Sequence, residues 1–307
     1  MPAATLKPED GLLGLSPEDA AAEAPNDAPG TPKAVVIPFG LERTVSWRAG
    51  TGAGPQAIIE ASHQVELFDE EHWCEPYRHF RLETLVEPEM PERIEDALEL
   101  LAGITGDVLD AGAFPLVLGG EHSLTPGAIR PFVARHPDLA LLHFDAHADL
   151  RDGYEGEHYS HAAAIRRCMD APDLTVVSLG IRNISAGEVP FLEDNRHRLH
   201  IHWAKDRDSW NLDDIVRPLE GRPVYVTFDL DGFDSSLMSA TGTPEPGGMF
   251  WADVMPVLRR AAQVSTFVGA DIVELAPAPE LFACDFLAAK LAYKILGYAF
   301  CATGAQD

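Results

Sequence analysis

Short apolar runs alternate with segments of helical periodicity through most of this 307-residue chain, and their order restricts its fold more than any other feature. The runs that suit strands are residues 34–38, 115–118, 139–144, 174–180, 199–203, 224–228 and 266–273. The segments that suit helices are residues 55–66, 91–104, 125–135, 160–169, 212–219, 251–263 and 283–299. Such alternation is typical of a parallel sheet covered on both faces. We expect an α/β fold: a single three-layer α/β/α domain with a mainly parallel sheet.

The N-terminal stretch differs from the rest of the chain. Residues 16–32 are rich in proline, alanine and acid, and contain almost no large apolar side chains. Such a composition cannot bury enough apolar surface to offset the entropy of ordering. The sequence predicts a flexible N-terminal arm over residues 1–33 and one folded domain over residues 34–307.

Charge and cysteine usage restrict the partners and the compartment. The net charge of −26 argues against binding to nucleic acid or to an anionic membrane, and it favours a cationic substrate or metal ions. A solvated, soluble surface explains most of these charges equally well. The four cysteines are far apart, the N-terminus has no leader pattern, and no apolar stretch approaches the length of a membrane span. We expect a cytoplasmic protein that is neither exported nor inserted into a membrane.

Histidine and aspartate side chains follow three of the predicted strands. The candidate metal ligands are His122 after 115–118, then Asp145, His147 and Asp149 after 139–144, and Asp229 and Asp231 after 224–228. A lone Asp-x-Asp is weak evidence, because aspartate at a strand end more often caps a helix or forms a turn. The Asp-x-His-x-Asp run is stronger, since residues at i, i+2 and i+4 share one face of a strand. All six lie beyond the carboxyl ends of parallel strands, where ligands bind in such sheets.

These ligand types indicate the metal. Histidine with several carboxylates, and without clustered thiolates, suits Mn²⁺ better than a structural zinc ion. Six ligands are too many for one catalytic ion. If Asp145 and Asp229 bridge, each of two ions receives four protein contacts, and a water molecule fits between ions that lie about 3.5–4 Å apart. The sequence predicts two Mn²⁺ ions per subunit.

The motifs resemble those of the ureohydrolase family, whose arginases and agmatinases hydrolyse guanidino groups to urea and an amine. The resemblance runs from about Ala34 to the C-terminus, and it rests on residues 119–123, 143–149, 228–234 and 240–248. It implies an arginase-like fold, a catalytic domain over residues 34–307, and a homo-oligomer, trimer or hexamer. It also divides the ligands: His122, Asp145, Asp149 and Asp229 for one Mn²⁺, and Asp145, His147, Asp229 and Asp231 for the other.

The resemblance also assigns catalytic roles. Glu274 would hold the guanidinium, although a glutamate after a buried strand is by itself more often a cap or an ion-pair partner. Asp149 would transfer a proton to the leaving amine, and His161 would act as the proton shuttle. His158 is a nearby competitor. We favour His161 because it precedes small residues at a helix start, as in the family.

The substrate depends on loops. Agmatine, hydrolysed to putrescine and urea for polyamine synthesis, is the first choice, because residues 45–55 and 243–248 look agmatinase-like, whereas the 150–159 loop and Asn183 depart from the arginase pattern. Arg151 favours instead a guanidino acid such as 4-guanidinobutanoate, and acids at 152, 155 and 157 could reverse that balance. An arginase, a guanidinase and a non-catalytic homologue are less favoured.

Overall fold

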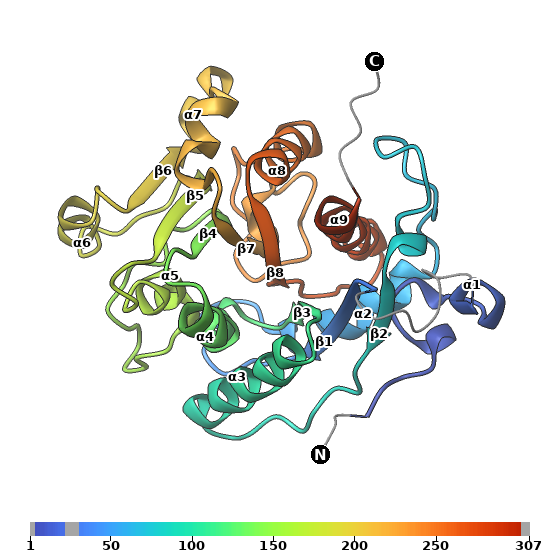
Figure 1. Cartoon of the computed structure of the whole chain (residues 1–307). Coiled ribbons are helices and arrows are strands. Elements are labelled where there is room, and N and C mark those ends of the chain that lie inside the picture. The colour runs from blue at the N-terminus through green and yellow to red at the C-terminus, as the bar shows by residue number, and fades with distance from the viewer. Residues whose placement is uncertain (1–3, 22–30, 302–307) are drawn as a thin grey trace.

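The computed structural model describes residues 4–21 and 31–301, and its centre is an eight-stranded sheet (Figure 1). The strand order is β2-β1-β3-β8-β7-β4-β5-β6, and every neighbouring pair is parallel. The strands are β1 Lys33–Phe39, β2 Arg81–Thr84, β3 Phe114–Gly119, β4 Ala140–Phe144, β5 Thr175–Ile181, β6 Leu199–Trp203, β7 Pro223–Asp229 and β8 Thr266–Val273. The predicted parallel α/β fold is confirmed.

Helices cover both faces of this sheet (Figure 1). They are α1 Pro17–Ala21, α2 Gly54–Ser62, α3 Ile94–Asp110, α4 Thr125–Arg135, α5 Ala164–Cys168, α6 Val189–Asp194, α7 Leu212–Val216, α8 Trp251–Val264 and α9 Phe282–Phe300. One core packs α2, α7, α8 and α9 against the sheet, and the other packs α3, α4, α5 and α6. Along β4, Leu142 and Phe144 face the first core while Leu141 faces the second, as the two-residue period of a strand requires.

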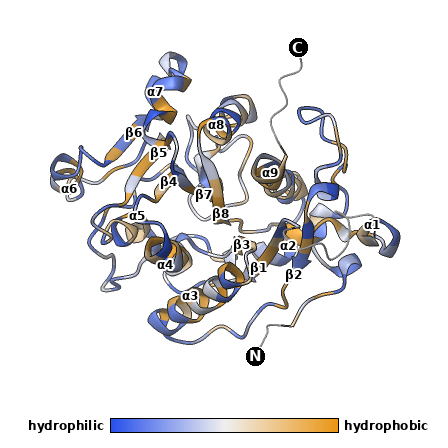
Figure 2. Cartoon of the chain, viewed as in Figure 1, coloured by the Kyte–Doolittle hydropathy of each residue, from blue (hydrophilic) through white to orange (hydrophobic). Residues whose placement is uncertain are grey.

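Local sequence explains where most helices begin and which side they bury. In α3 the buried residues recur at helical spacing, for example Ile94, Leu98 and Leu101. Helices α2 and α4 carry proline in their first turn, where a missing N–H costs no hydrogen bond. Figure 2 shows apolar residues concentrated on the strands and polar residues on the outer parts of the helices.

Three elements, α1, β2 and α6, were not predicted, and several boundaries differ. Strand β2 is a short edge strand with one fully buried residue, so it lacks an apolar run. Helix α6 spans only six residues, too short for a clear period. Helix α2 ends at Ser62 instead of residue 66, and α3 continues to Asp110.

The predicted flexible arm is wrong for part of residues 1–33. Leu12, Leu13 and Leu15 are buried in the core, and the Leu13 N–H donates to Ser62 Oγ at 2.7 Å. Three leucines within four residues supply the apolar area that the proline-rich part lacks. Residues 1–3 and 22–30 of the predicted arm lie outside the described residues.

Within residues 4–21 and 31–301, none of the helices is both long enough and apolar enough to cross a bilayer.

Candidate metal centre and active site

Four neighbouring strands in the middle of the sheet carry the predicted site. His122 follows β3, Glu274 follows β8, Asp229 ends β7, and Asp145 follows β4. The register pairs Phe144 with Phe228 and Asp229 with Val273, so these strands end at one level. Parallel strands expose their carboxyl ends at the same edge, and this edge therefore gathers the six predicted ligands and Glu274.

His122 lies at the centre of a ring of carboxylates. Its Nδ1 atom is 3.2 Å from Asp145 Oδ2, 3.2 Å from Asp149 Oδ2 and 3.3 Å from Asp229 Oδ2. Neighbouring ligand atoms of a divalent ion bound at about 2.1 Å are themselves about 3.0–3.4 Å apart. The three distances from His122 to the carboxylates of the first predicted metal site lie in this range.

The tautomer of His122 is also consistent with a metal ion bound at Nδ1. Its Nε2 atom lies 2.9 Å from Thr227 Oγ1, and Thr227 donates its only hydroxyl proton to Asp271 Oδ1 at 2.6 Å. Thr227 can therefore only accept from the imidazole, so Nε2 carries the proton. Nδ1 faces three carboxylates; burial lowers the pKa of His122, but these carboxylates outweigh it and raise the pKa well above its ordinary value, so without a cation a proton fills the place between them. A bound cation would replace that proton and accept the Nδ1 lone pair, while the Nε2–H stays on Thr227.

The second predicted site lies beside the first and shares Asp145 with it. His147 Nδ1 is 3.0 Å from Asp231 Oδ2 and 3.6 Å from Asp145 Oδ1. Backbone groups hold the carboxylates in place: Asp231 Oδ1 accepts from the Ala146 N–H at 3.0 Å, and Asp229 Oδ1 accepts from the Asp231 N–H at 2.9 Å. These geometries suit Asp145 as a bridging ligand.

The shifted pKa values of the cluster reflect the many carboxylates that lie close together in it. Burial and the Asp145 charge raise the pKa of Asp149 to about 7. Burial, Asp231 and Asp145 raise the pKa of Asp229 well above its ordinary value. Burial lowers the pKa of His147, but Asp231 and Asp145 outweigh that effect and raise it to about 12. Without cations, the cluster must hold extra protons to persist.

His143 contacts Asp145, one of the predicted metal ligands. Its Nε2 atom lies 2.9 Å from Asp145 Oδ2, and its Nδ1 atom lies 2.9 Å from Ser178 Oγ. It is close enough to His122 and Asp145 to belong to a possible ligand set with them. Because Nε2 already contacts the carboxylate, we assign His143 to orienting Asp145 and not to the metal.

Asp234 shapes the loop that follows β7. Its Oδ2 atom accepts from the N–H groups of Gly247 and Gly248, at 2.6 Å and 3.0 Å, and Ser236 donates to Oδ1. These hydrogen bonds, that of Ser236 foremost, lower the pKa of Asp234 to about 2. The carboxylate is therefore used by the loop after β7 and is not a metal ligand.

A cavity of about 310 Å³ opens over the cluster. Glu274 and Asp149 line it, and both have left-handed backbone conformations, with φ of 69° and 53°. Non-glycine residues rarely adopt such angles, and strain of this kind concentrates at functional sites. Glu274 is held by the His122 N–H, which donates to Oε1 at 2.7 Å, and its pKa is raised to about 8, mainly by burial. A buried carboxyl in this position is suited to receive a cation.

The structure separates the two candidate shuttle histidines. His161 lines the cavity, with Nδ1 at 3.0 Å from Thr44 Oγ1, and Thr44 in turn donates to Glu121 Oε1 at 2.9 Å. His158 instead contacts the Arg167 guanidinium, with Nδ1 at 2.7 Å from an Arg167 nitrogen. Burial, outweighing nearby Glu121, lowers the pKa of His161, so its imidazole is neutral near pH 7 and able to take up a proton. His161 is the better placed of the two.

The distal part of the cavity corrects one expectation about the tail. Arg151 lines the cavity, and its guanidinium lies 4.7 Å from the centre of the Tyr154 ring. Asp152, which was expected to offset Arg151, pairs with Arg167 at 2.7 Å instead. Neither residue 155 nor residue 157 is among the cavity residues. The acid that does line the distal part is Glu188, whose carboxylate accepts from Ser185 and from the Leu150 N–H.

Several residues of the site escaped prediction from sequence. They are Thr44, Glu121, Glu188, Thr227 and Asp271. Glu121 lies in the same motif as His122, and Thr44 directly precedes the agmatinase-like residues 45–55, so proximity to these motifs was the only signal available. Thr227 and Asp271 are interior strand residues whose polar character alone could have drawn attention.

Comparison with known proteins decides the family. A sequence model of the Arginase family matches residues 32–297. The chain belongs to the arginase family. It is 34% identical over 274 residues to the N(1)-aminopropylagmatine ureohydrolase of Synechocystis sp., covering 86% of this chain and 88% of that protein. It is also 34% identical to the agmatinase of Bacillus anthracis, over 79% of this chain and 83% of that one.

Solved structures agree with this assignment. The agmatine ureohydrolase of Thermoplasma volcanium superposes with a TM-score of 0.78 at 29% identity, covering 89% of this chain and 92% of that one. The proclavaminate amidino hydrolase of Streptomyces clavuligerus gives a TM-score of 0.84 at 24% identity, over 96% of this chain and 100% of that one, which supports the fold alone. The predicted resemblance is confirmed: this arginase-family chain is an agmatinase-like ureohydrolase, a hydrolase of guanidino C–N bonds.

Proposed function

We propose that this enzyme hydrolyses agmatine to putrescine and urea at a binuclear Mn²⁺ centre. The observation that carries the metal part is the position of His122 Nδ1, which lies 3.2–3.3 Å from three carboxylate oxygens. The relatives named agmatinase and N(1)-aminopropylagmatine ureohydrolase support agmatine or a substituted agmatine as substrate. A cytoplasmic location and a homo-oligomer, trimer or hexamer, stay predictions.

The residues of the cavity suit the steps of guanidine hydrolysis. When bound, two divalent ions lower the pKa of a water molecule far enough to supply hydroxide at neutral pH. Glu274 holds the guanidinium by a charge-assisted hydrogen bond, which turns the electrophilic carbon toward the carboxylate cluster. Asp149, between the cluster and the cavity, passes a proton to the leaving amine. His161 exchanges that proton with solvent through the open side of the cavity.

The second candidate substrate is a guanidino acid. It is favoured by Arg151, which lines the cavity and forms no ion pair with any described residue. A carboxylate tail would pair with that guanidinium, whereas the ammonium of agmatine would have to avoid it. Agmatine remains the first candidate for two reasons. The chain is similar to proteins named agmatinase, and Glu188, an acid that could pair with an ammonium, lines the cavity together with Arg151.

A urea-release assay tests the substrate. The enzyme, supplied with Mn²⁺, is compared on agmatine, N(1)-aminopropylagmatine, 4-guanidinobutanoate, arginine and guanidine. We expect the highest kcat/KM on agmatine. A higher value on 4-guanidinobutanoate would replace agmatine with the guanidino acid, and urea release from none of them would refute the proposed function.

Metal removal and variants of the ligands test the centre. Chelation should abolish activity, and Mn²⁺ should restore it with about two ions per chain. Asp145→Asn, which alters the proposed bridge, should lower activity more than His122→Asn, which alters a terminal ligand. Asp96→Asn, the same chemical change on the exposed side of α3, is the control. Full activity in a metal-free preparation would refute the binuclear mechanism.

A further inference from the structure

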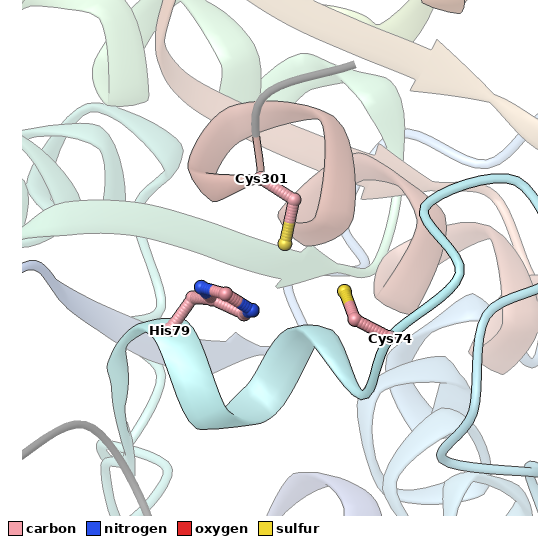
Figure 3. Close-up of side chains that lie close together, drawn as sticks. All are labelled: Cys74, His79 and Cys301. Carbon is pink, nitrogen blue, oxygen red and sulfur yellow. The ribbon is translucent and has the colours of Figure 1, made fainter. Parts of the chain in front are cut away.

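A second group of possible metal ligands lies at the other end of the sheet. Figure 3 shows the Cys74 and Cys301 sulfur atoms and the His79 imidazole pointing toward one another. One ligand atom from each of the three side chains lies within 4.8 Å of the other two. Cys301 directly follows α9, His79 ends the turn Pro76–His79, and Cys74 precedes that turn. Segments far apart in sequence thus bring two thiols and an imidazole together.

Packing holds these segments in place without any ion. The neighbours of His79 and Cys301 in the chain, Phe80 and Phe300, stack with ring centroids 4.5 Å apart. On the other side, the Asp69 N–H donates to the Cys74 carbonyl at 2.7 Å, and Asp69 pairs with the ammonium of Lys294 on α9 at 2.8 Å. The three side chains are therefore presented by a preformed framework, which lowers the entropy lost on binding.

We propose that Cys74, His79 and Cys301 bind one thiophilic cation, Zn²⁺, at a site separate from the manganese centre. Two thiolates and one imidazole form a soft donor set that selects Zn²⁺, whereas the carboxylate-rich centre suits Mn²⁺. A tetrahedral zinc ion with bonds of about 2.3 Å to sulfur and 2.0–2.1 Å to nitrogen holds its ligand atoms about 3.3–3.8 Å apart. Because His79 is exposed and Cys74 is half-buried, a water molecule takes the fourth position.

The site is remote from the catalytic chemistry. Phe300, beside Cys301, packs edge-on against Phe114, with ring centroids 5.7 Å apart. Phe114 begins β3, whereas the catalytic residues follow the other end of that strand. A six-residue strand spans about 17–20 Å. An ion here would join the end of α9 to the segment before β2, and its role would be to stabilise the fold.

Proton release gives the site a recognisable pH dependence. Binding must displace the thiol protons, because the thiolate is the metal ligand. The affinity for Zn²⁺ should therefore rise with pH.

Cobalt substitution tests the proposal. The full-length protein, reduced and loaded with Mn²⁺, is titrated with Co²⁺, and the near-ultraviolet thiolate-to-cobalt charge-transfer band is recorded. The described ligands of the manganese centre include no thiolate, so a band reports on cysteine ligation and not on the catalytic site. We expect a band that saturates at one Co²⁺ per chain and is removed by an equivalent of Zn²⁺.

Variants decide which cysteines are responsible. Cys74→Ser should abolish the band and His79→Ala should weaken it, whereas Cys284→Ser, a buried cysteine of α9 outside the group, should leave it unchanged. Zn²⁺ should raise the melting temperature of the wild-type protein and of Cys284→Ser, but not that of Cys74→Ser. The proposal is overturned if the reduced wild-type protein shows no band, or if the band survives in Cys74→Ser. Both results are independent of urea release, so they leave the proposed function standing.

Discussion

Replacing Thr227 by valine should weaken the metal site at His122 although Thr227 itself contacts no metal. The hydroxyl of Thr227 accepts from His122 Nε2–H at 2.9 Å and donates to Asp271 Oδ1 at 2.6 Å, and all three residues are buried. Valine has nearly the same shape but cannot accept that hydrogen bond. The His122 ring then loses the contact that keeps its proton on Nε2 and its lone pair toward the carboxylates.

The expected loss of metal affinity follows from the free energy of leaving a buried hydrogen-bond donor without an acceptor. Leaving the imidazole N–H unsatisfied costs about 1–3 kcal/mol. Loss of a hydrogen bond behind a ligating histidine lowers metal affinity by about 10–100-fold, which corresponds to about 1.4–2.7 kcal/mol. The two ranges agree, so the affinity of one Mn²⁺ per chain should fall by one to two orders of magnitude while the other ion is affected less.

Chelator competition, followed by urea release at limiting Mn²⁺, measures this effect. Thr227→Ser keeps a hydroxyl and should restore the affinity. Thr125→Val is the matched control, because Thr125 donates to the same Asp271 at 3.0 Å but makes no hydrogen bond to His122. If Thr227→Val binds both ions as tightly as the wild-type protein, or if Thr125→Val weakens the ions equally, the reasoning about the His122 tautomer fails.

Three further perturbations test other parts of the molecule. His161→Asn should lower kcat by roughly 10²-fold with metal content unchanged, whereas His158→Asn should not, and the reverse result would reassign the shuttle. Arg151→Ala should leave agmatine hydrolysis unchanged or faster, but it should reduce kcat/KM by about 1.5–3 kcal/mol if a guanidino acid is the substrate; no effect on either would remove Arg151 from substrate binding. Burial raises the pKa of Asp69, but the hydrogen bond and charge of Lys294 outweigh it and lower the pKa. Because the folded-state pKa is the lower one, this carboxylate stabilises the fold above about pH 4 and loses that effect as the pH falls through its folded-state pKa. Acid unfolding of Asp69→Asn, followed by circular dichroism, should therefore show a weaker dependence on pH below about pH 4, and an unchanged slope would contradict this.

Local sequence patterns were sufficient to predict a large part of the fold and of the candidate site. The boundaries of β6 and β8 match their apolar runs, and α4 matches its predicted span, because period and proline placement are properties of neighbouring residues. The prediction failed at β2 and along residues 12–15, where burial depends on what packs against a short segment. The sequence could not reveal that those leucines fill a gap beside α2.

The sequence by itself determined which side chains would meet at the centre, because Asp145, His147 and Asp149 are close in the chain and strand ends share one edge of a parallel sheet. Only the tertiary structure decided how each of them is held. The order β3-β8-β7-β4 sets Thr227 and Asp271 behind His122, and the pairing of Asp152 with Arg167 leaves Arg151 at the cavity. These contacts join residues that are distant in sequence, so they depend on packing and hydrogen bonding across the whole domain, which no local pattern encodes.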